Sequence, residues 1–239
     1  MGIEWLAGQV AIVTGASRGI GKAAAIALSE AGSTVVLAAR DGKALGETSE
    51  IIRAKGGEAI AIECDVADEA QVKAMFRKAQ QRGPVKILLC AAGILEKSPF
   101  GEMTLDLWER VISVNLTGTF LCCREAFTSM AASGGGRIIT LSSLSGVYGT
   151  EKFPGLAAYN VSKNGVLGLT EALAVEGRAK NISAICLSPG AVDTEMLRQA
   201  NPLIDPGLVP DQVGKMIVSL LDESMAHASG ANIMLFSNR

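Results

Sequence analysis

The chain has only two tyrosines, and a lysine follows each of them four residues later: Lys152 follows Tyr148, and Lys163 follows Tyr159. A phenol can donate a proton in catalysis when a nearby ammonium lowers its pKa from about 10 toward the working pH. Two side chains four residues apart are neighbours on one face of a helix. Either pair therefore forms an acid–base centre only if its segment is helical.

The residues around each pair distinguish the two. A glycine follows Tyr148 directly, and a proline and a glycine at positions 154–155 end its segment, which predicts a loop. Tyr159 stands at the head of segment 160–177, in which apolar residues recur with helical spacing. We predict that Tyr159 and Lys163 carry the chemistry and that the first pair lies in a loop over the site.

A glycine-rich turn near the N-terminus has the composition of a phosphate site. The apolar run 10–14 leads directly into Gly15-Ala16-Ser17-Arg18-Gly19-Ile20-Gly21 and then into an alanine-rich segment with helical spacing. Glycines allow a tight turn, close approach of backbone N–H groups to a pyrophosphate, and packing of helix on strand, while the helix N-terminus faces the anion. We predict a dinucleotide site in this turn, formed by Gly15, Ser17, Arg18, Gly19, Ile20 and Gly21.

The end of the second apolar run indicates which dinucleotide binds. A protein that binds NAD places Asp or Glu there, on the 2′-hydroxyl of the ribose. This chain has Ala39 and then Arg40, and Arg18 lies in the glycine-rich turn. Two guanidiniums can hold a 2′-phosphate, which favours NADP(H) and leaves NAD(H) possible. Asp41 argues the other way, but it can also be the cap of the helix that follows.

Strand-like and helical segments alternate along the whole chain and must position these residues. Continuous apolar strands separated by helices predict a parallel sheet covered on both faces, because right-handed crossovers place a helix over each strand pair. The fold class is α/β, a doubly wound Rossmann fold, and we expect a single domain over residues 1–239 with a lid at about 195–210. The predicted strands are 10–14, 34–39, 59–63, 85–90, 137–141, 182–187 and 233–236.

Composition and charge limit the partners. The 239 residues carry a formal net charge of −2, which gives no general attraction to a polyanion, so we expect no nucleic-acid partner. The longest apolar runs are strand-sized and too short for a membrane span. An acidic residue, Glu4, stands where a signal peptide is basic, so we expect a cytoplasmic protein with a small-molecule substrate.

The cysteines and the single histidine suggest no metal chemistry. The five cysteines show no C-x-x-C spacing, and we expect them to be buried free thiols. With His227 as the only histidine, no two-histidine metal site can be assembled, and we expect His227 on the surface.

The glycine-rich turn and the second tyrosine pair together resemble the short-chain dehydrogenase/reductase family over nearly the whole chain. The glycines at 15, 19 and 21 follow the T-G-x-x-x-G-x-G pattern of that family rather than G-x-G-x-x-G. The resemblance implies an oxidoreductase in which Tyr159 donates a proton while Lys163 lowers its pKa and holds the nicotinamide ribose. It also implies a homodimer or homotetramer that pairs through helices predicted at 104–127 and 160–177.

The same resemblance assigns further site residues by their matching motifs. Ser143 would bind the substrate carbonyl, with Ser142 and Ser145 as rivals, and Asn115 would hold a water in a proton relay. Asp65 and Val66, at the end of the third strand, would contact the adenine. Further cofactor contacts would come from Ala91 and Gly93 after the fourth strand and from Pro189, Val192 and Thr194 after the sixth.

Two departures from the family pattern bear on the expected function. Cys90-Ala91-Ala92-Gly93 stands where the family has N-N-A-G, which removes side-chain hydrogen bonds but leaves backbone contacts. The segment between Thr194 and the helix predicted at 209–221 is also short, and in the family it covers the substrate.

The resemblance favours an NADP(H)-dependent carbonyl reductase, in its most specific form a 3-oxoacyl-acyl-carrier-protein reductase. A carrier protein is acidic and needs basic residues at the mouth of the site, for which Arg124, Arg178 and Lys180 are candidates. The alternatives are a dehydrogenase of a sugar, polyol or steroid alcohol and a catalytically inactive nucleotide sensor.

Overall fold

The computed structural model describes residues 3–237, and its centre is one parallel sheet of seven strands in the order β3-β2-β1-β4-β5-β6-β7. The strands are β1 (Val10–Thr14), β2 (Thr34–Ala39), β3 (Ala59–Glu63), β4 (Val85–Cys90), β5 (Gly136–Leu141), β6 (Ile182–Pro189) and β7 (Asn232–Leu235). The doubly wound fold and all seven strands are thus confirmed. The structure shifts bounds only in β5, β6 and β7.

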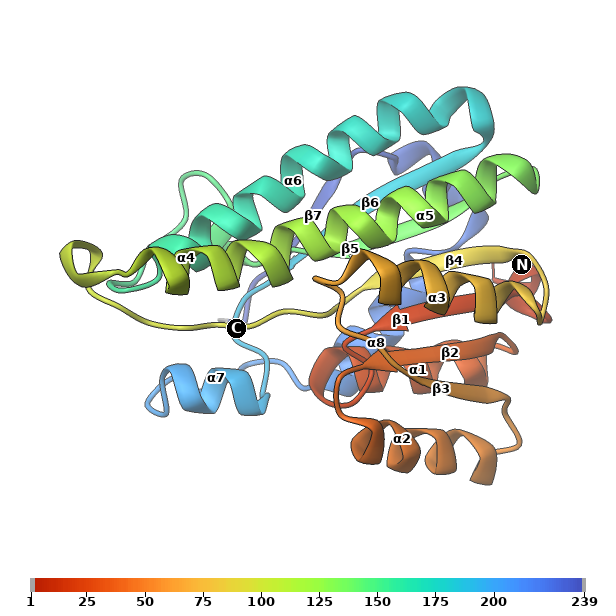
Figure 1. The fold of residues 1–239 in the computed structure, drawn as a ribbon, viewed down its shortest axis with the longest axis horizontal. Coiled ribbons are helices and arrows are strands. Elements are labelled where there is room, and N and C mark those ends of the chain that lie inside the picture. The colour runs from red at the N-terminus through yellow and green to blue at the C-terminus, as the bar shows by residue number, and fades with distance from the viewer. Residues whose placement is uncertain (1–2, 238–239) are drawn as a thin grey trace.

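Helices cover both faces of the sheet (Figure 1). One face carries α1 (Gly19–Glu30), α2 (Gly42–Ala54) and α8 (Pro210–Ser219). The other carries α3 (Glu69–Gln80), α5 (Gly118–Ala132) and α6 (Ala157–Gly177). Each face of the sheet packs against its helices in a separate hydrophobic core, because successive side chains of a strand point to opposite faces. In β1, Ala11 and Val13 lie in the core beneath α1, α2 and α8, and Val10 and Ile12 lie in the core on the other face.

The helix predicted at 104–127 differs from the observed one in two respects. The observed helix extends to Ala132. A π-helical turn, η3 (Ser113–Thr117), divides the observed helix into α4 (Leu105–Ile112) and α5. A π-turn inserts one extra residue into the helical ladder and occurs often at functional sites. Here it places Asn115 inside the molecule, with none of the residue exposed. Apolar periodicity shows only the helical stripe, so it could not locate this turn.

The remaining short helices lie at both ends of the strands, and η1 (Glu4–Leu6) and η6 (Glu223–Ala228) precede β1 and β7. Short helix α7 (Glu195–Ala200) follows β6, and η2 (Phe100–Glu102) and η4 (Leu144–Gly146) follow β4 and β5. Opposite them, at the amino-terminal ends, η5 (Arg178–Lys180) precedes β6. The strand order reverses between β1 and β4, and doubly wound sheets bind ligands at the carboxyl ends beside such a switch. Among residues 3–237, no helix has both the length and the apolar character needed to cross a membrane.

Candidate active site

A cavity of about 630 Å³ lies at the carboxyl ends of the strands, beside the switch between β1 and β4. Its volume is within the range of ligand sites in proteins, roughly 300–1,000 Å³. Its walls come from the turn after β1, from the ends of β2, β3 and β4, from the start of α6, and from the segment around α7. The cavity therefore joins the predicted nucleotide turn to the predicted tyrosine–lysine pair.

The glycine-rich turn has a shape that only glycines permit. Gly15 and Gly19 have φ angles of +67° and +55°, which L side chains rarely adopt. A Cβ on Gly21 would lie 2.2 Å from the carbonyl oxygen of Gly15, so a side chain there cannot be accommodated without moving the backbone. The turn leads into the N-terminus of α1, whose first N–H groups favour an anion. This cradle fits a dinucleotide phosphate.

The end of β2 carries one cation and one anion at the cavity rim. Arg40 is exposed, lines the cavity and has no ion-pair partner among the residues that the structure describes. Asp41 caps α2, which is one of the two roles considered for it from the sequence. Its Oδ1 accepts a hydrogen bond of 3.0 Å from the Ala44 N–H. This edge of the cavity therefore offers an unpaired guanidinium, which suits a 2′-phosphate.

The predicted adenine contacts lie at the end of β3. Asp65 and Val66 both line the cavity. The Asp65 Oδ1 accepts a hydrogen bond of 3.0 Å from the Ala67 N–H, and its own N–H donates to Gln71. The first bond fixes the carboxylate at the rim and leaves its other oxygen for a ligand, and the second fixes the backbone of Asp65.

Tyr159 and Lys163 lie on the inner face of α6 and border the cavity. Only 8% of Tyr159 and 6% of Lys163 are exposed. The Lys163 Nζ lies 5.7 Å from the centre of the Tyr159 ring and donates a hydrogen bond of 2.8 Å to the Leu141 carbonyl. The other pair lies in a loop, as predicted, with Tyr148 96% exposed.

Burial changes the pKa of both members of this pair. Burial raises the pKa of Tyr159, and only a hydrogen bond with Ser143 acts in the opposite direction. Burial also lowers the pKa of Lys163 to about 8. The ammonium is directed at the Leu141 carbonyl, and its expected effect on the phenol pKa stays a prediction. A cationic nicotinamide beside the ring would favour the phenolate.

The three candidate serines have different roles. The Ser142 hydroxyl donates to the backbone carbonyl of Lys163 over 2.7 Å and is therefore committed to the α6 backbone. The Ser145 N–H donates to the Ser143 Oγ over 3.2 Å, which leaves the Ser143 hydroxyl proton free. Ser143 is partly buried and, unlike Ser142, does not line the cavity, but it is the serine that lowers the pKa of Tyr159, which places it beside the phenol.

Asn115 joins η3 to the loop after β4. Its Oδ1 accepts a bond of 2.8 Å from the Ile94 N–H, and its Nδ2 donates to the Ile94 carbonyl at 2.9 Å and to the Ser162 Oγ at 3.0 Å. Both amide protons are thus used within the protein. A relay water held by Asn115 must therefore bind through an oxygen of that residue.

The loop after β4 is shaped by a threonine that sequence reasoning missed. Thr14 Oγ1 accepts hydrogen bonds from the N–H groups of Ala91 and Ala92, at 3.1 and 3.2 Å. Cys90 packs away from the cavity, with its Sγ 3.8 Å from that of Cys123. A Cβ on Gly93 would lie 3.3 Å from Asn115 Oδ1. The threonine directly before Gly15 was the signal that could have revealed this contact.

The residues predicted after β6 divide into two groups. Pro189 and Thr194 line the cavity, whereas Val192 is buried and does not. The Thr194 Oγ1 caps α7 by accepting a hydrogen bond of 3.2 Å from the Leu197 N–H, so only its hydroxyl proton is left for a ligand. Glu195 and Met196, which sequence reasoning did not single out, line the cavity as well.

Comparison with known proteins identifies the family of this fold and site. A sequence model of the family described as short chain dehydrogenase matches residues 9–204. The chain belongs to the short-chain dehydrogenase family. Within the family, it is 35% identical to the 3-oxoacyl-[acyl-carrier-protein] reductase of Synechocystis sp., over 94% of each chain. It is also 35% identical to the acetoacetyl-CoA reductase of Shinella zoogloeoides, over 94% of this chain and 95% of that one.

Solved structures of the family agree with this fold. A short-chain dehydrogenase/reductase from Mycobacterium marinum superposes with a TM-score of 0.91 at 33% identity, covering 97% of this chain and 95% of that one. A protein from Beutenbergia cavernae, provisionally named as an NAD(P)-dependent gluconate 5-dehydrogenase and holding NADP at low occupancy, superposes with a TM-score of 0.90 at 30% identity, covering 97% of this chain and 96% of that one. This short-chain dehydrogenase is therefore an oxidoreductase of a family that uses NAD(P)(H).

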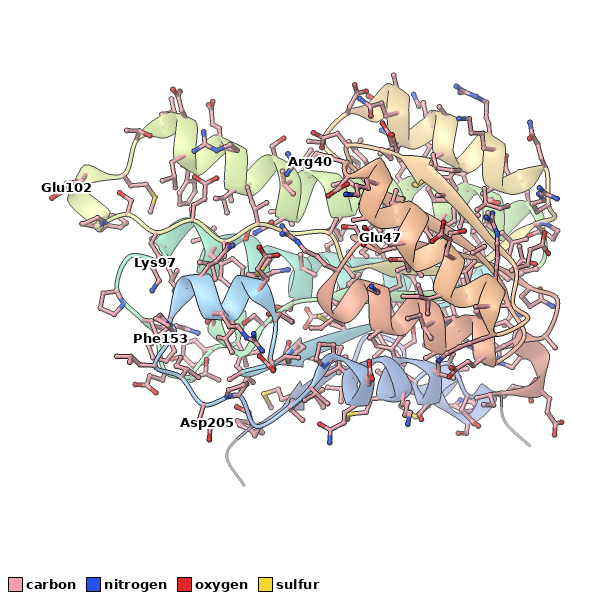
Figure 2. All side chains as sticks on the ribbon, turned by 90° about the horizontal axis from the view of Figure 1, so that it is seen from below. Arg40, Glu47, Lys97, Glu102, Phe153 and Asp205 are labelled. Atoms are coloured by element: carbon pink, nitrogen blue, oxygen red, sulfur yellow. The ribbon has the colours of Figure 1, made fainter. Side chains whose placement is uncertain are left out.

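Two loops and α7 border the open side of the site in this short-chain dehydrogenase. Figure 2 shows Lys97 beside the C-terminal end of α7, and its Nζ donates to the Ala200 carbonyl there. The Ser98 N–H donates over 3.0 Å to the carbonyl of Gly155, which ties the loop after β4 to the loop before α6. Phe153, on the latter loop, is 40% exposed at the same end of the molecule (Figure 2).

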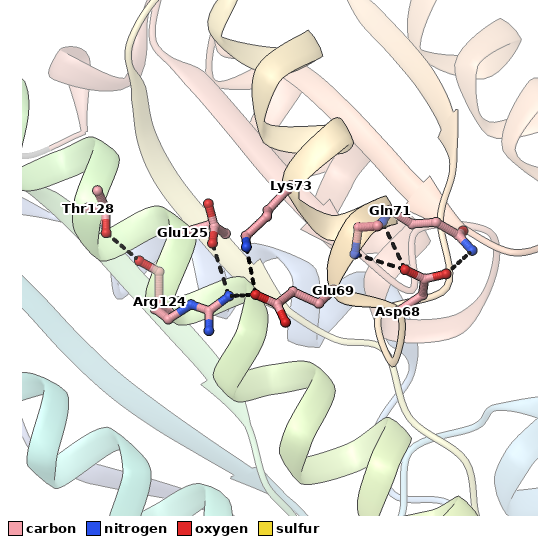
Figure 3. A network of polar contacts seen from close by, with 8 residues as sticks. Asp68, Glu69, Gln71, Lys73, Arg124, Glu125 and Thr128 are labelled. Carbon is pink, nitrogen blue, oxygen red and sulfur yellow. Dashed lines mark hydrogen bonds and ion pairs between the residues drawn. The ribbon is translucent and has the colours of Figure 1, made fainter.

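The basic residues considered for a carrier protein do not form a patch at this mouth. Arg124 lies on α5 and is paired with Glu69 of α3 at 2.7 Å and with Glu125 at 3.2 Å (Figure 3). Arg178 and Lys180 belong to η5, at the opposite ends of the strands. None of these three candidates therefore provides an unpaired cation at the mouth of the site.

Proposed function

We propose that this short-chain dehydrogenase is an NADP(H)-dependent carbonyl reductase and that its substrate is a 3-oxoacyl thioester. The observation that carries the proposal is the buried pair of Tyr159 and Lys163, which borders the same cavity as the glycine cradle and has the partly buried Ser143 beside the phenol. The 35% identity to an acyl-carrier-protein reductase and to an acetoacetyl-CoA reductase over nearly full length supports the thioester.

Several residues support NADP(H) as the cofactor. Arg40 is exposed at the cavity rim without an ion-pair partner among residues 3–237, and Arg18 lines the same cavity. Asp41, the acidic residue that follows Arg40, is used as a helix cap. A 2′-phosphate with nearly two negative charges gains more from these guanidiniums than a hydroxyl does.

The mechanism follows from the positions of the side chains. When bound, the nicotinamide supplies the hydride in reduction or accepts it in oxidation. In reduction, the Ser143 hydroxyl donates a hydrogen bond to the carbonyl oxygen of the substrate, and Tyr159 gives its phenolic proton to that oxygen as negative charge develops there. Lys163 holds a positive charge beside the phenol, and Asn115 fixes the loop after β4 at Ile94.

A second candidate is the oxidation of an alcohol. The chain is 36% identical, over 81% of its length, to a 3beta-hydroxysteroid dehydrogenase of Mediterraneibacter gnavus. The same residues serve this reaction in reverse, with Tyr159 accepting the proton. An assay in both directions separates the two candidates.

We also propose that the chain acts in the cytoplasm as a single domain in a homodimer or homotetramer. All five cysteines are free thiols, which supports a reducing compartment such as the cytoplasm. All seven strands of the described residues belong to one sheet, which supports a single domain. Outward apolar side chains on α4, α5 and α6, among them Leu105, Phe120 and Val175, suit a helical interface between copies. Sedimentation as a monomer at micromolar concentration would contradict this assembly.

The test is the loss of NADPH absorbance with acetoacetyl-CoA, beside NADH and beside two tyrosine variants. We expect turnover with NADPH, at least tenfold lower turnover with NADH, and no turnover for Tyr159→Phe, which keeps its affinity for NADPH. Tyr148→Phe is the matched control and should keep full activity, because Tyr148 is 96% exposed in the other loop. Near-full activity in Tyr159→Phe would refute the assignment. Turnover only with alcohols and NADP⁺ would select the second candidate.

A further inference from the structure

One ion pair connects the phosphate turn to α7 across the cavity. The Arg18 guanidinium, before α1, lies 2.7 Å from the Oε2 of Glu195, at the start of α7. The two residues are 177 positions apart in the sequence, and both line the cavity. Their side chains are 68% and 56% exposed, so the pair lies at the rim, where an incoming ligand can reach it.

The carboxylate of Glu195 is aimed at this guanidinium by its own helix. Its second oxygen, Oε1, accepts a hydrogen bond of 3.0 Å from Gln199, one turn further along α7. The preceding residue, Thr194, contacts the phosphate turn itself: its Cγ2 would lie 3.3 Å from a Cβ on Gly19. The start of α7 therefore covers the phosphate turn, and the Arg18–Glu195 pair is the charged contact that joins them.

The two guanidiniums proposed for the 2′-phosphate are thus unlike each other. Arg40 has no ion-pair partner in the described chain, whereas Arg18 already has a carboxylate. A phosphate that approaches Arg18 competes with that carboxylate and is repelled by it, because both are anions that need the same donors. A ligand without the 2′-phosphate does not compete with Glu195 for the Arg18 guanidinium.

We propose that Glu195 is a specificity-determining residue: its carboxylate competes with the cofactor's 2′-phosphate for Arg18 and so limits the preference for NADP(H) over NAD(H). This inference rests on the proposed cofactor. Binding of the 2′-phosphate withdraws Arg18 from Glu195 and releases the start of α7 from the phosphate turn. Binding of NAD(H) leaves the pair intact.

The test measures binding without any reaction. Isothermal titration calorimetry at low ionic strength compares 2′,5′-ADP with 5′-AMP, which differ only in the 2′-phosphate. In Glu195→Gln we expect the affinity for 2′,5′-ADP to rise about threefold to fivefold, the range of one exposed ion pair, and the affinity for 5′-AMP to stay the same.

Asp193→Asn is the matched control. It breaks an exposed ion pair of 2.7 Å with Arg198 in the same segment, and neither residue of that pair lines the cavity. This control should leave the ratio of the two affinities unchanged. In an Arg18→Gln background, the effect of Glu195→Gln should disappear, because the shared guanidinium is gone.

The outcomes separate the inference from the function on which it rests. If the unmodified protein binds both nucleotides equally, the NADP(H) preference fails, and the role of Glu195 fails with it. If it prefers 2′,5′-ADP but Glu195→Gln changes neither affinity or both alike, the preference stands and the inference is overturned. The inference is also overturned if Asp193→Asn raises the ratio as much as Glu195→Gln does.

Discussion

Replacing Asn115 with alanine tests whether the loop after β4 is held from η3. The asparagine is fully buried, and its side chain makes three hydrogen bonds, two to the backbone of Ile94 and one to Ser162. Each is worth about 1 kcal/mol, and partly buried groups of Ile94 left without partners add to the loss. We therefore expect Asn115→Ala to lower the free energy of unfolding by about 3–4 kcal/mol.

The assay is urea unfolding, with thermal unfolding as a second readout. For a chain of this size, 1 kcal/mol corresponds to roughly 2–4 °C, so the midpoint temperature should fall by about 10 °C. Thr119→Val is the control, because it removes one hydrogen bond of 2.7 Å, to the Asn115 carbonyl, and leaves the side-chain contacts intact. It should cost about 1 kcal/mol. If Asn115→Ala costs no more than Thr119→Val, the asparagine does not hold the loop, and the reasoning is refuted.

Two further predictions concern the lysines of the tyrosine pairs. Burial lowers the pKa of Lys163 to about 8 from 10.5, so between these values the unfolded chain binds a proton that the folded chain lacks, and stability rises with pH. Relative to Lys163→Met, the unmodified protein should gain about 2 kcal/mol between pH 7 and 9.5 in urea unfolding, and an equal response of both proteins would contradict the buried ammonium. The Lys152 Nζ donates hydrogen bonds to the carbonyls of Ser145 and Val147 at 2.7 and 2.5 Å. These bonds hold the loop between β5 and α6 in place beside Ser143. Lys152→Ala should raise the KM for substrate severalfold and leave the Kd for NADPH unchanged, and an unchanged KM would show that the loop needs no such anchor.

The sequence predicted the sheet because its signals are local. Each strand is a short apolar run, and each glycine of the phosphate turn has a conformation or a close contact that its own position requires. The choice of Tyr159 over Tyr148 was also local, since it depended only on whether the next residues continue a helix. Apolar periodicity and turn residues carry this information without knowledge of distant contacts.

The features that the sequence did not reveal depend on residues far apart in the chain. The π-turn at Asn115 follows from contacts with Ile94 and Ser162, and the pairing of Arg18 depends on a glutamate 177 positions away. The direction of the Lys163 ammonium depends likewise on the Leu141 carbonyl. No local pattern encodes such partners, so the sequence could not show where the Lys163 ammonium is directed or that Arg178 and Lys180 lie at the opposite ends of the strands.

The strand order has a consequence for how the chain reaches its native state. β1 pairs with β2 next to it in the sequence, but its other neighbour is β4, and Thr14 pairs with Cys90 across that seam. The pairing of β1 with β4 closes the long segment of chain between these two strands. Closing such a segment is entropically costly, and parallel sheets of this kind form slowly. The phosphate turn follows β1 and the loop held by Thr14 follows β4, so the nucleotide cradle is complete only when this seam has closed. A fluorescent nucleotide added during refolding should therefore bind in the last kinetic phase, and its binding would report the joining of the two halves of the sheet.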